Sequence, residues 1–106
     1  MKKIILILIV TATFSIKADP LTDDQIKSFN IENLNSKSFD TRMNTFRIIE
    51  VMDWKDKYRD EIEKAILKML KSTDIMQKRT GIQGENLLHM DNPDIYEAIV
   101  RNVQTS

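Results

Sequence analysis

Few residues in this chain have the type and spacing that catalysis or metal binding requires. His89 is the only histidine and cysteine is absent, so a zinc site would need carboxylates such as Asp91 and Asp94 as its remaining ligands. A histidine at a helix end more often lies near the last carbonyl groups, where a partial positive charge is favourable. We expect that structural role for His89, with no metal and no cofactor.

Carboxylates are numerous, and Glu61 with Glu63 or Asp91 with Asp94 could be considered as a general acid and base. Such a pair needs one buried carboxyl group with a raised pKa. Both pairs lie in polar stretches or turns, which predicts solvated side chains. The lack of cysteine also excludes thiol catalysis. We therefore expect a protein that is not an enzyme.

Aromatic residues offer a different chemistry, that of a protein contact. Trp54, Tyr58 and Tyr96 combine a large apolar ring with a polar group, and such residues are enriched at protein interfaces. Tyr58 and Tyr96 are predicted near the starts of two similar helices, and Arg59 follows Tyr58 directly. We predict a protein-binding surface that includes Trp54, Tyr58, Arg59 and Tyr96. The alternative is that Trp54 and Tyr58 only cover the core.

The N-terminal segment differs from the rest of the chain. A short basic start precedes an almost wholly apolar run at residues 4–14, and Ala18 supplies a small residue where a signal peptidase would cleave. This pattern is typical of a secretory signal peptide, and the apolar run is shorter than the roughly 20 residues that span a bilayer. We predict that residues 1–18 are removed after Ala18; the alternative is that they are retained as an anchor. A single helical domain of residues 19–106 would then act in the periplasm or outside the cell, without stable membrane anchoring.

Charge and composition narrow the class of partner. Without the predicted signal peptide, 13 basic and 16 acidic residues give a formal net charge of −3. A slightly acidic chain does not attract nucleic acid, and the basic face of a membrane-surface helix is missing. Without cysteine an exported domain of this size has no disulfides, so helix packing or a partner must stabilise it. We expect another protein as the partner, or a second copy of the chain in a homodimer.

Apolar residues recur with the period of an α-helix in five segments, and turn or capping residues separate them. The segments are expected to start after Thr22, at about Phe39, at Trp54, after Asp74 and at Pro93. Thr22 and Gln25 have the spacing of a capping box. The sequence therefore predicts an all-α fold of about five helices.

The helix at about residues 39–52 is predicted to bury one side. Its apolar residues include Met52, while Arg42 and Thr45 fall on the opposite, polar side. Asp53 suits the N-cap of the following helix. We therefore expect a tight turn between two antiparallel helices.

The helix at residues 54–70 has the clearest division between an apolar and a charged face. On the charged face lysines alternate with acids, and pairs such as Asp60 with Lys64 stand four residues apart. Pairs of opposite charge at this spacing stabilise a helix by a few tenths of a kcal/mol. We expect a solvated face with such ion pairs.

The helix after Asp74 is less regular. Ile75 opens its apolar pattern, and Gly81 and Gly84 lie inside it. Each glycine costs about 1 kcal/mol in a helix interior relative to alanine. The two glycines therefore mark either a break or a close crossing of helices.

Two of the predicted helices are similar in sequence. Residues 62–70 align with residues 95–103 without a gap, at an offset of 33 residues, and share Ile, Ala and Ile at the same positions. Helix pairs repeated at this spacing are typical of solenoid proteins.

The chain resembles HEAT-type α-helical hairpin repeats over about residues 38–103. The turn at residues 89–94 looks like the Asp-Pro turn of such a unit, and Asp40-Thr41-Arg42 is similar to the Asp and Arg near the start of its first helix. The resemblance implies a short α-solenoid with hairpins at about 39–70 and 74–103. The alternative is an irregular five-helix bundle.

Together these features predict an exported, non-enzymatic protein that binds another protein. Stacked helical hairpins expose long side-chain surfaces and need no catalytic residues. By architecture, small exported helical proteins of this kind look like immunity proteins that inhibit a secreted toxin. The alternative function is that of a structural envelope protein that associates with itself.

Overall fold

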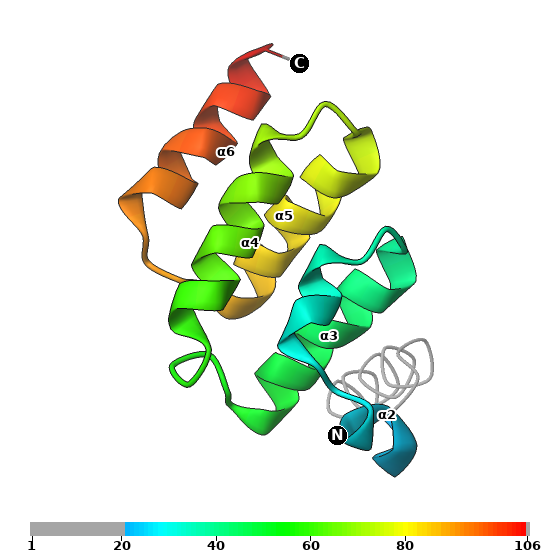
Figure 1. Ribbon diagram of the computed structural model, residues 1–106. Helices are drawn as coiled ribbons and strands as arrows, with labels where there is room; N and C mark the ends of the chain where they lie inside the picture. Colours follow the sequence, from blue (N-terminus) through cyan, green and yellow to red (C-terminus); the bar gives the residue numbers. More distant parts are fainter. Residues whose placement is uncertain (1–20, 106) are drawn as a thin grey trace, which may run out of the picture.

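A computed structural model describes residues 21–105 of the chain, with the backbone alone for residues 103–105. This part is entirely helical and contains no strand, which confirms the predicted all-α class (Figure 1). The predicted signal peptide at residues 1–18 and the predicted inward side chain of Val103 lie outside the described residues. Five α-helices and one 3-10 helix occur: α2 Asp23–Lys27, η1 Ile31–Asn35, α3 Phe39–Met52, α4 Arg59–Lys71, α5 Ile75–Leu88 and α6 Pro93–Thr105.

Capping side chains define where several helices begin. Thr22 and Gln25 form the predicted capping box, each side chain accepting a hydrogen bond from the other residue's backbone N–H, at 3.1 and 2.8 Å. Ser38 Oγ accepts from the Thr41 amide at the start of α3, and Asp74 Oδ1 accepts from the Met76 amide at the start of α5. These bonds satisfy amides that have no partner inside the helix, so the sequence located these starts correctly.

The prediction that the central helix begins at Trp54 is wrong, since α4 begins at Arg59. Asp53 does not cap α4 but ends α3 in the left-handed region, with φ of 56°. The Trp54 amide donates back to the Ile49 carbonyl at 2.9 Å, the bond that closes a Schellman-type helix end. Residues 54–57 therefore lie outside α4, with turns at residues 55–58, and Tyr58 occupies the N-cap position without a side-chain bond.

Helices that are apart in the sequence lie side by side. Gly84 of α5 packs on Phe46 of α3, and Arg42 reaches Thr80 one turn earlier in both helices, so α3 and α5 run parallel. Similarly, Asn92 contacts Glu63 and Asn102 contacts Leu70, so α6 runs in the direction of α4. The closest packing is between α4 and α5, while η1 covers α3 (Figure 1).

One core fills the space between these helices. Ile62, Ala65, Ile66 and Met69 of α4 and Ile95 of α6 are buried in it, whereas Trp54, Tyr58, Ala98 and Ile99 are partly buried and pack against it. The largest apolar members are Leu34, Phe46, Ile49, Ile62, Ile66, Met90 and Ile95.

Four side chains lie on the side opposite to the prediction. Arg42 and Thr45 were expected in solvent but are buried, because η1 and α5 contact α3 on two sides. Met52 and Ile75 were expected inside, yet 38 % and 72 % of their surfaces are exposed. Both lie in the terminal turn of their helix.

The two glycines of α5 mark a close helix crossing and not a break. The helix runs through both positions without a positive φ. A Cβ atom at Gly84 would lie 2.5 Å from Cζ of Phe46, and one at Gly81 would lie 3.1 Å from Cβ of Met69. Glycine therefore allows α5 to approach α3 and α4 at the same time.

Candidate functional site

Two of the four predicted contact residues, Trp54 and Tyr58, pack together against Phe29, which precedes η1. The ring centroids of Trp54 and Tyr58 lie 6.2 Å apart. The centroid of the Phe29 ring lies 5.0 Å from that of Trp54 and 5.4 Å from that of Tyr58. The Lys57 ammonium lies over both rings, at 5.3 and 5.4 Å. All three rings are half-buried, so much of their apolar surface is used to hold the segment before η1 on residues 54–58.

Arg59 joins two connections of the chain. Its guanidinium donates to the Met90 carbonyl at 3.2 Å and pairs with Asp56, which raises the pKa of Arg59 further above its usual value. Lys55 donates to the Leu88 and His89 carbonyls at 2.9 and 3.2 Å. Basic side chains thus satisfy carbonyl groups at the end of α5. They also join the connection before α4 to the connection between α5 and α6.

Tyr96 lies apart from that aromatic cluster, in the first turn of α6. Its side chain is 72 % exposed and borders a shallow cavity of about 370 Å³ that Glu85, His89 and Asp91 also line. His89 occupies the left-handed C-cap of α5, with φ of 53°. Within residues 21–105, no three His, Asp or Glu side chains are grouped closely enough to hold a metal ion.

Glu85 is a half-buried carboxylate that the sequence did not single out. Both of its oxygens accept from the Met90 amide, at 3.0 and 3.2 Å. Burial raises the pKa of Glu85 above its usual value, and the bond from Met90 opposes this effect. The signal available in the sequence was its position four residues before the left-handed helix end at His89.

Replacing Glu85 with glutamine is expected to change the pH dependence of stability. Because the pKa is raised on folding, wild-type Glu85 stabilises the fold below the unfolded value of about 4.3, and that contribution is lost as the pH rises through the folded value. Urea unfolding at a series of pH values should show that the free energy of unfolding of E85Q increases relative to that of wild type as the pH rises. Glu50→Gln, at an exposed position of α3, is the control. A constant difference between E85Q and wild type would contradict the expectation.

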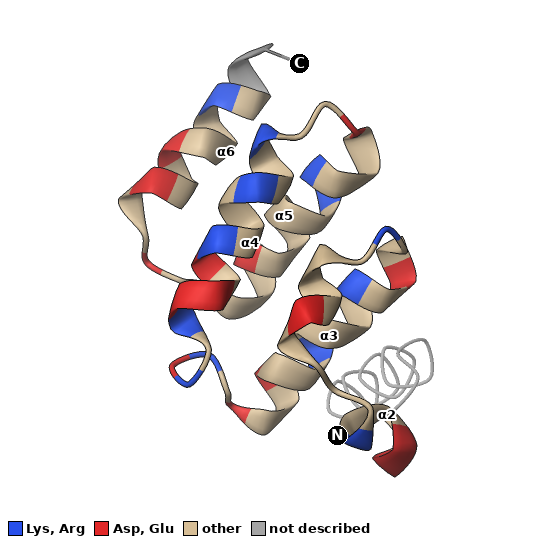
Figure 2. Cartoon of the chain, in the orientation of Figure 1, with Lys and Arg blue, Asp and Glu red and all other residues tan. Residues whose placement is uncertain are grey.

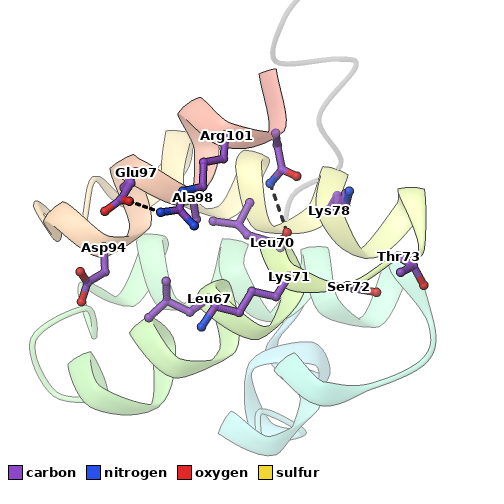
Figure 3. A pocket seen from close by; sticks show the side chains of 11 residues that line it. Leu67, Leu70, Lys71, Ser72, Thr73, Lys78, Asp94, Glu97, Ala98 and Arg101 are labelled. Atoms are coloured by element: carbon purple, nitrogen blue, oxygen red, sulfur yellow. Dashed lines mark hydrogen bonds and ion pairs between the residues drawn. The ribbon is translucent and has the colours of Figure 1, made fainter. Parts of the chain in front are cut away.

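A groove lies between the C-terminal end of α4, the start of α5 and α6 (Figure 3). Its volume is about 460 Å³. Leu67, Leu70 and Ala98 supply apolar surface, and Asp94 and Glu97 lie at one end (Figure 3). Ser72, Thr73 and Lys78 lie at the opposite end, and the Lys71 side chain extends from there back toward Leu67.

Lysines follow the outer face of α4 beside this groove. Lys64, Lys68 and Lys71 line an adjoining open depression together with Leu67, and Figure 2 shows further basic positions at the neighbouring ends of α5 and α6. The expected ion pair of Asp60 with Lys64 is absent. Within the described part of the chain the ion pairs are Arg59 with Asp56 and Arg101 with Glu97. An exposed pair gains little over solvated charges, so nothing forces it to form.

The described chain is thus an all-α domain whose charged groove and exposed Tyr96 lie on different parts of α6. A comparison with family models, curated proteins and solved structures finds no match. No helix within residues 21–105 is both long and apolar enough to cross a bilayer.

Proposed function

We propose that this protein is an exported, non-enzymatic module that binds another protein, built as a short α-solenoid of HEAT-like helix pairs. The parallel placement of α3 beside α5 and of α4 beside α6 carries the proposal. The contact from Asn102 to Leu70 spans 32 residues, close to the sequence offset of the two similar helices. Such a repeat forms its core between its layers and leaves outer helix faces available for a partner.

Several polar groups, among them the candidates His89 and Glu63, have structural roles. Glu85 accepts from the Met90 amide, Asp74 caps α5 and His89 ends α5. Asn92 donates to Glu63 at 2.8 Å and thereby ties the start of α6 to α4. These roles favour a binding function, and the predicted signal peptide favours a partner met after export. Inhibition of a secreted effector is the proposed form of that binding.

The proposal can be tested in the native cells. We expect the purified protein to begin at Asp19, to occur in the periplasmic or secreted fraction, and to be isolated there with one other protein in a fixed ratio. Intact-mass measurement after gentle cross-linking checks all three results. A protein that retains Met1 would contradict cleavage of the signal peptide, and its absence from both fractions would contradict export. A chain without any cross-linked partner would contradict the binding function.

Self-association is the second candidate, favoured by exposed apolar side chains. Tyr96 and Val51 expose 72 % and 61 % of their surfaces, and isolated residues of this kind can meet in a symmetric dimer. Light scattering after gel filtration over a range of concentrations separates the two candidates. A mass that doubles with concentration would favour the homodimer, and a constant monomer mass would exclude it.

A further inference from the structure

We propose that the groove between α4 and α6 binds an acidic, extended segment of the partner protein. Lys71 and Lys78 line this groove, and Lys64 and Lys68 line the open depression that adjoins it. These four residues are called the lysine rim. The inference rests on the proposed function and assigns it a surface and a chemical class of partner.

Within residues 21–105 no ion pair neutralises the charges of the lysine rim. None of the four lysines lies in ion-pair contact with a carboxylate there. Lys64 and Lys68 stand four residues apart on one helix, a spacing at which like charges destabilise the helix slightly. Carboxylates supplied by a partner would remove this repulsion and would be attracted to the rim.

Helix electrostatics account for only part of the rim. Lys68 and Lys71 lie near the C-terminus of α4, where the helix dipole favours a cation. Lys78, in contrast, lies beyond the first turn of α5, a helix whose N-cap is Asp74. No helix C-terminus therefore accounts for a cation at this position.

The remaining lining of the groove favours a peptide over other polyanions. Leu67, Leu70 and Ala98 offer an apolar surface beside the lysines. Asp94 and Glu97 at the other end (Figure 3) would repel a uniformly charged nucleic acid or lipid surface. A peptide can place carboxylates at the rim and an apolar side chain against Leu67.

Short fluorescent peptides test this assignment with the full chain. One set contains Asp and Glu interspersed with Leu, and a matched set has Asn and Gln in place of the acids. We expect the acidic set to bind more tightly, and we expect the double charge reversal K68E/K71E to weaken it by roughly tenfold or more. The exposed Lys27 and Lys37 supply the matched control K27E/K37E, which changes the net charge equally and should leave tight binding in place.

Three results would overturn the proposal. These are equal binding of the acidic and neutral sets, equal effects of the two double reversals, and tighter binding of phosphatidylserine vesicles or single-stranded DNA at the same lysines. Circular dichroism and the unfolding midpoint verify that K68E/K71E remains folded. If K68E/K71E still cross-links to the native partner as wild type does, the groove assignment fails while the proposed binding function stands.

Discussion

Replacing Arg42 with methionine is expected to lower the free energy of unfolding by about 3 kcal/mol, because three hydrogen-bonded connections are lost at once. Arg42 is 1 % exposed. Its guanidinium donates to Thr80 Oγ1 at 3.0 and 3.2 Å and to the Ser36 carbonyl at 2.9 Å, with a longer contact to the Met76 carbonyl at 3.4 Å. One side chain thus joins α3 to α5 and to the C-terminal end of η1.

The partners of Arg42 are neutral, which makes the shape of the guanidinium as important as its charge. No carboxylate within the described residues pairs with it, and the Phe39 ring lies 5.9 Å from its central carbon. Lysine would retain the charge but cannot donate in several fixed directions. We therefore expect R42K to be about as unstable as R42M.

Urea unfolding followed by circular dichroism measures these differences. Arg79→Met is the matched control, because Arg79 is exposed on α5 and surface substitutions usually change stability by less than about 0.5 kcal/mol. If R42K is as stable as wild type, the positive charge at this position is sufficient to stabilise the fold. Wild-type stability of R42M would show that the buried network does not stabilise the fold.

The substitution Gly84→Ala is expected to lower the free energy of unfolding by about 2 kcal/mol. The new methyl group would lie 2.5 Å from Cζ of Phe46, whose ring is fully buried and cannot move aside freely. Overpacking of this kind costs up to about 3 kcal/mol, and the better helix propensity of alanine returns only about 1 kcal/mol. The steric cost therefore exceeds the gain.

The control for this prediction is the second glycine of the same helix. At Gly81 the nearest atoms are at 3.1 and 3.2 Å and belong to Met69 and Leu70, so we expect G81A to remain within about 1 kcal/mol of wild type. Phe46→Leu should cost less in G84A than in wild type, with a coupling of about 1 kcal/mol in a double-mutant cycle. Additive effects would show that the Phe46 ring is not the cause.

The sequence was sufficient to predict the helix class and most helix starts. Thr22 with Gln25, Ser38 and Asp74 make the capping bonds expected of them. Pro93 is the first residue of α6, as expected. These features depend on neighbours within a few residues, so a local pattern contains the information. The prediction for the start of α4 was wrong because Asp53 suits either a helix start or a left-handed helix end.

Of the four predicted contact residues, Trp54 and Tyr58 contact each other, and both contact Phe29, a residue 25 positions before Trp54. The sequence did not single out Glu85 or the groove beside α4. The lining of that groove comes from three helices, so no single segment of sequence contains its pattern.

The tertiary structure alone decided which polar and small residues are structural. Periodicity placed Arg42 on the outer side of one helix, but α3 is contacted from two directions, so that side is also buried. Gly81 and Gly84 reduce helix propensity locally, and only the approach of α3 and α4 shows why they are required. Burial depends on neighbours that are distant in the chain, whereas helix formation and capping depend on adjacent residues.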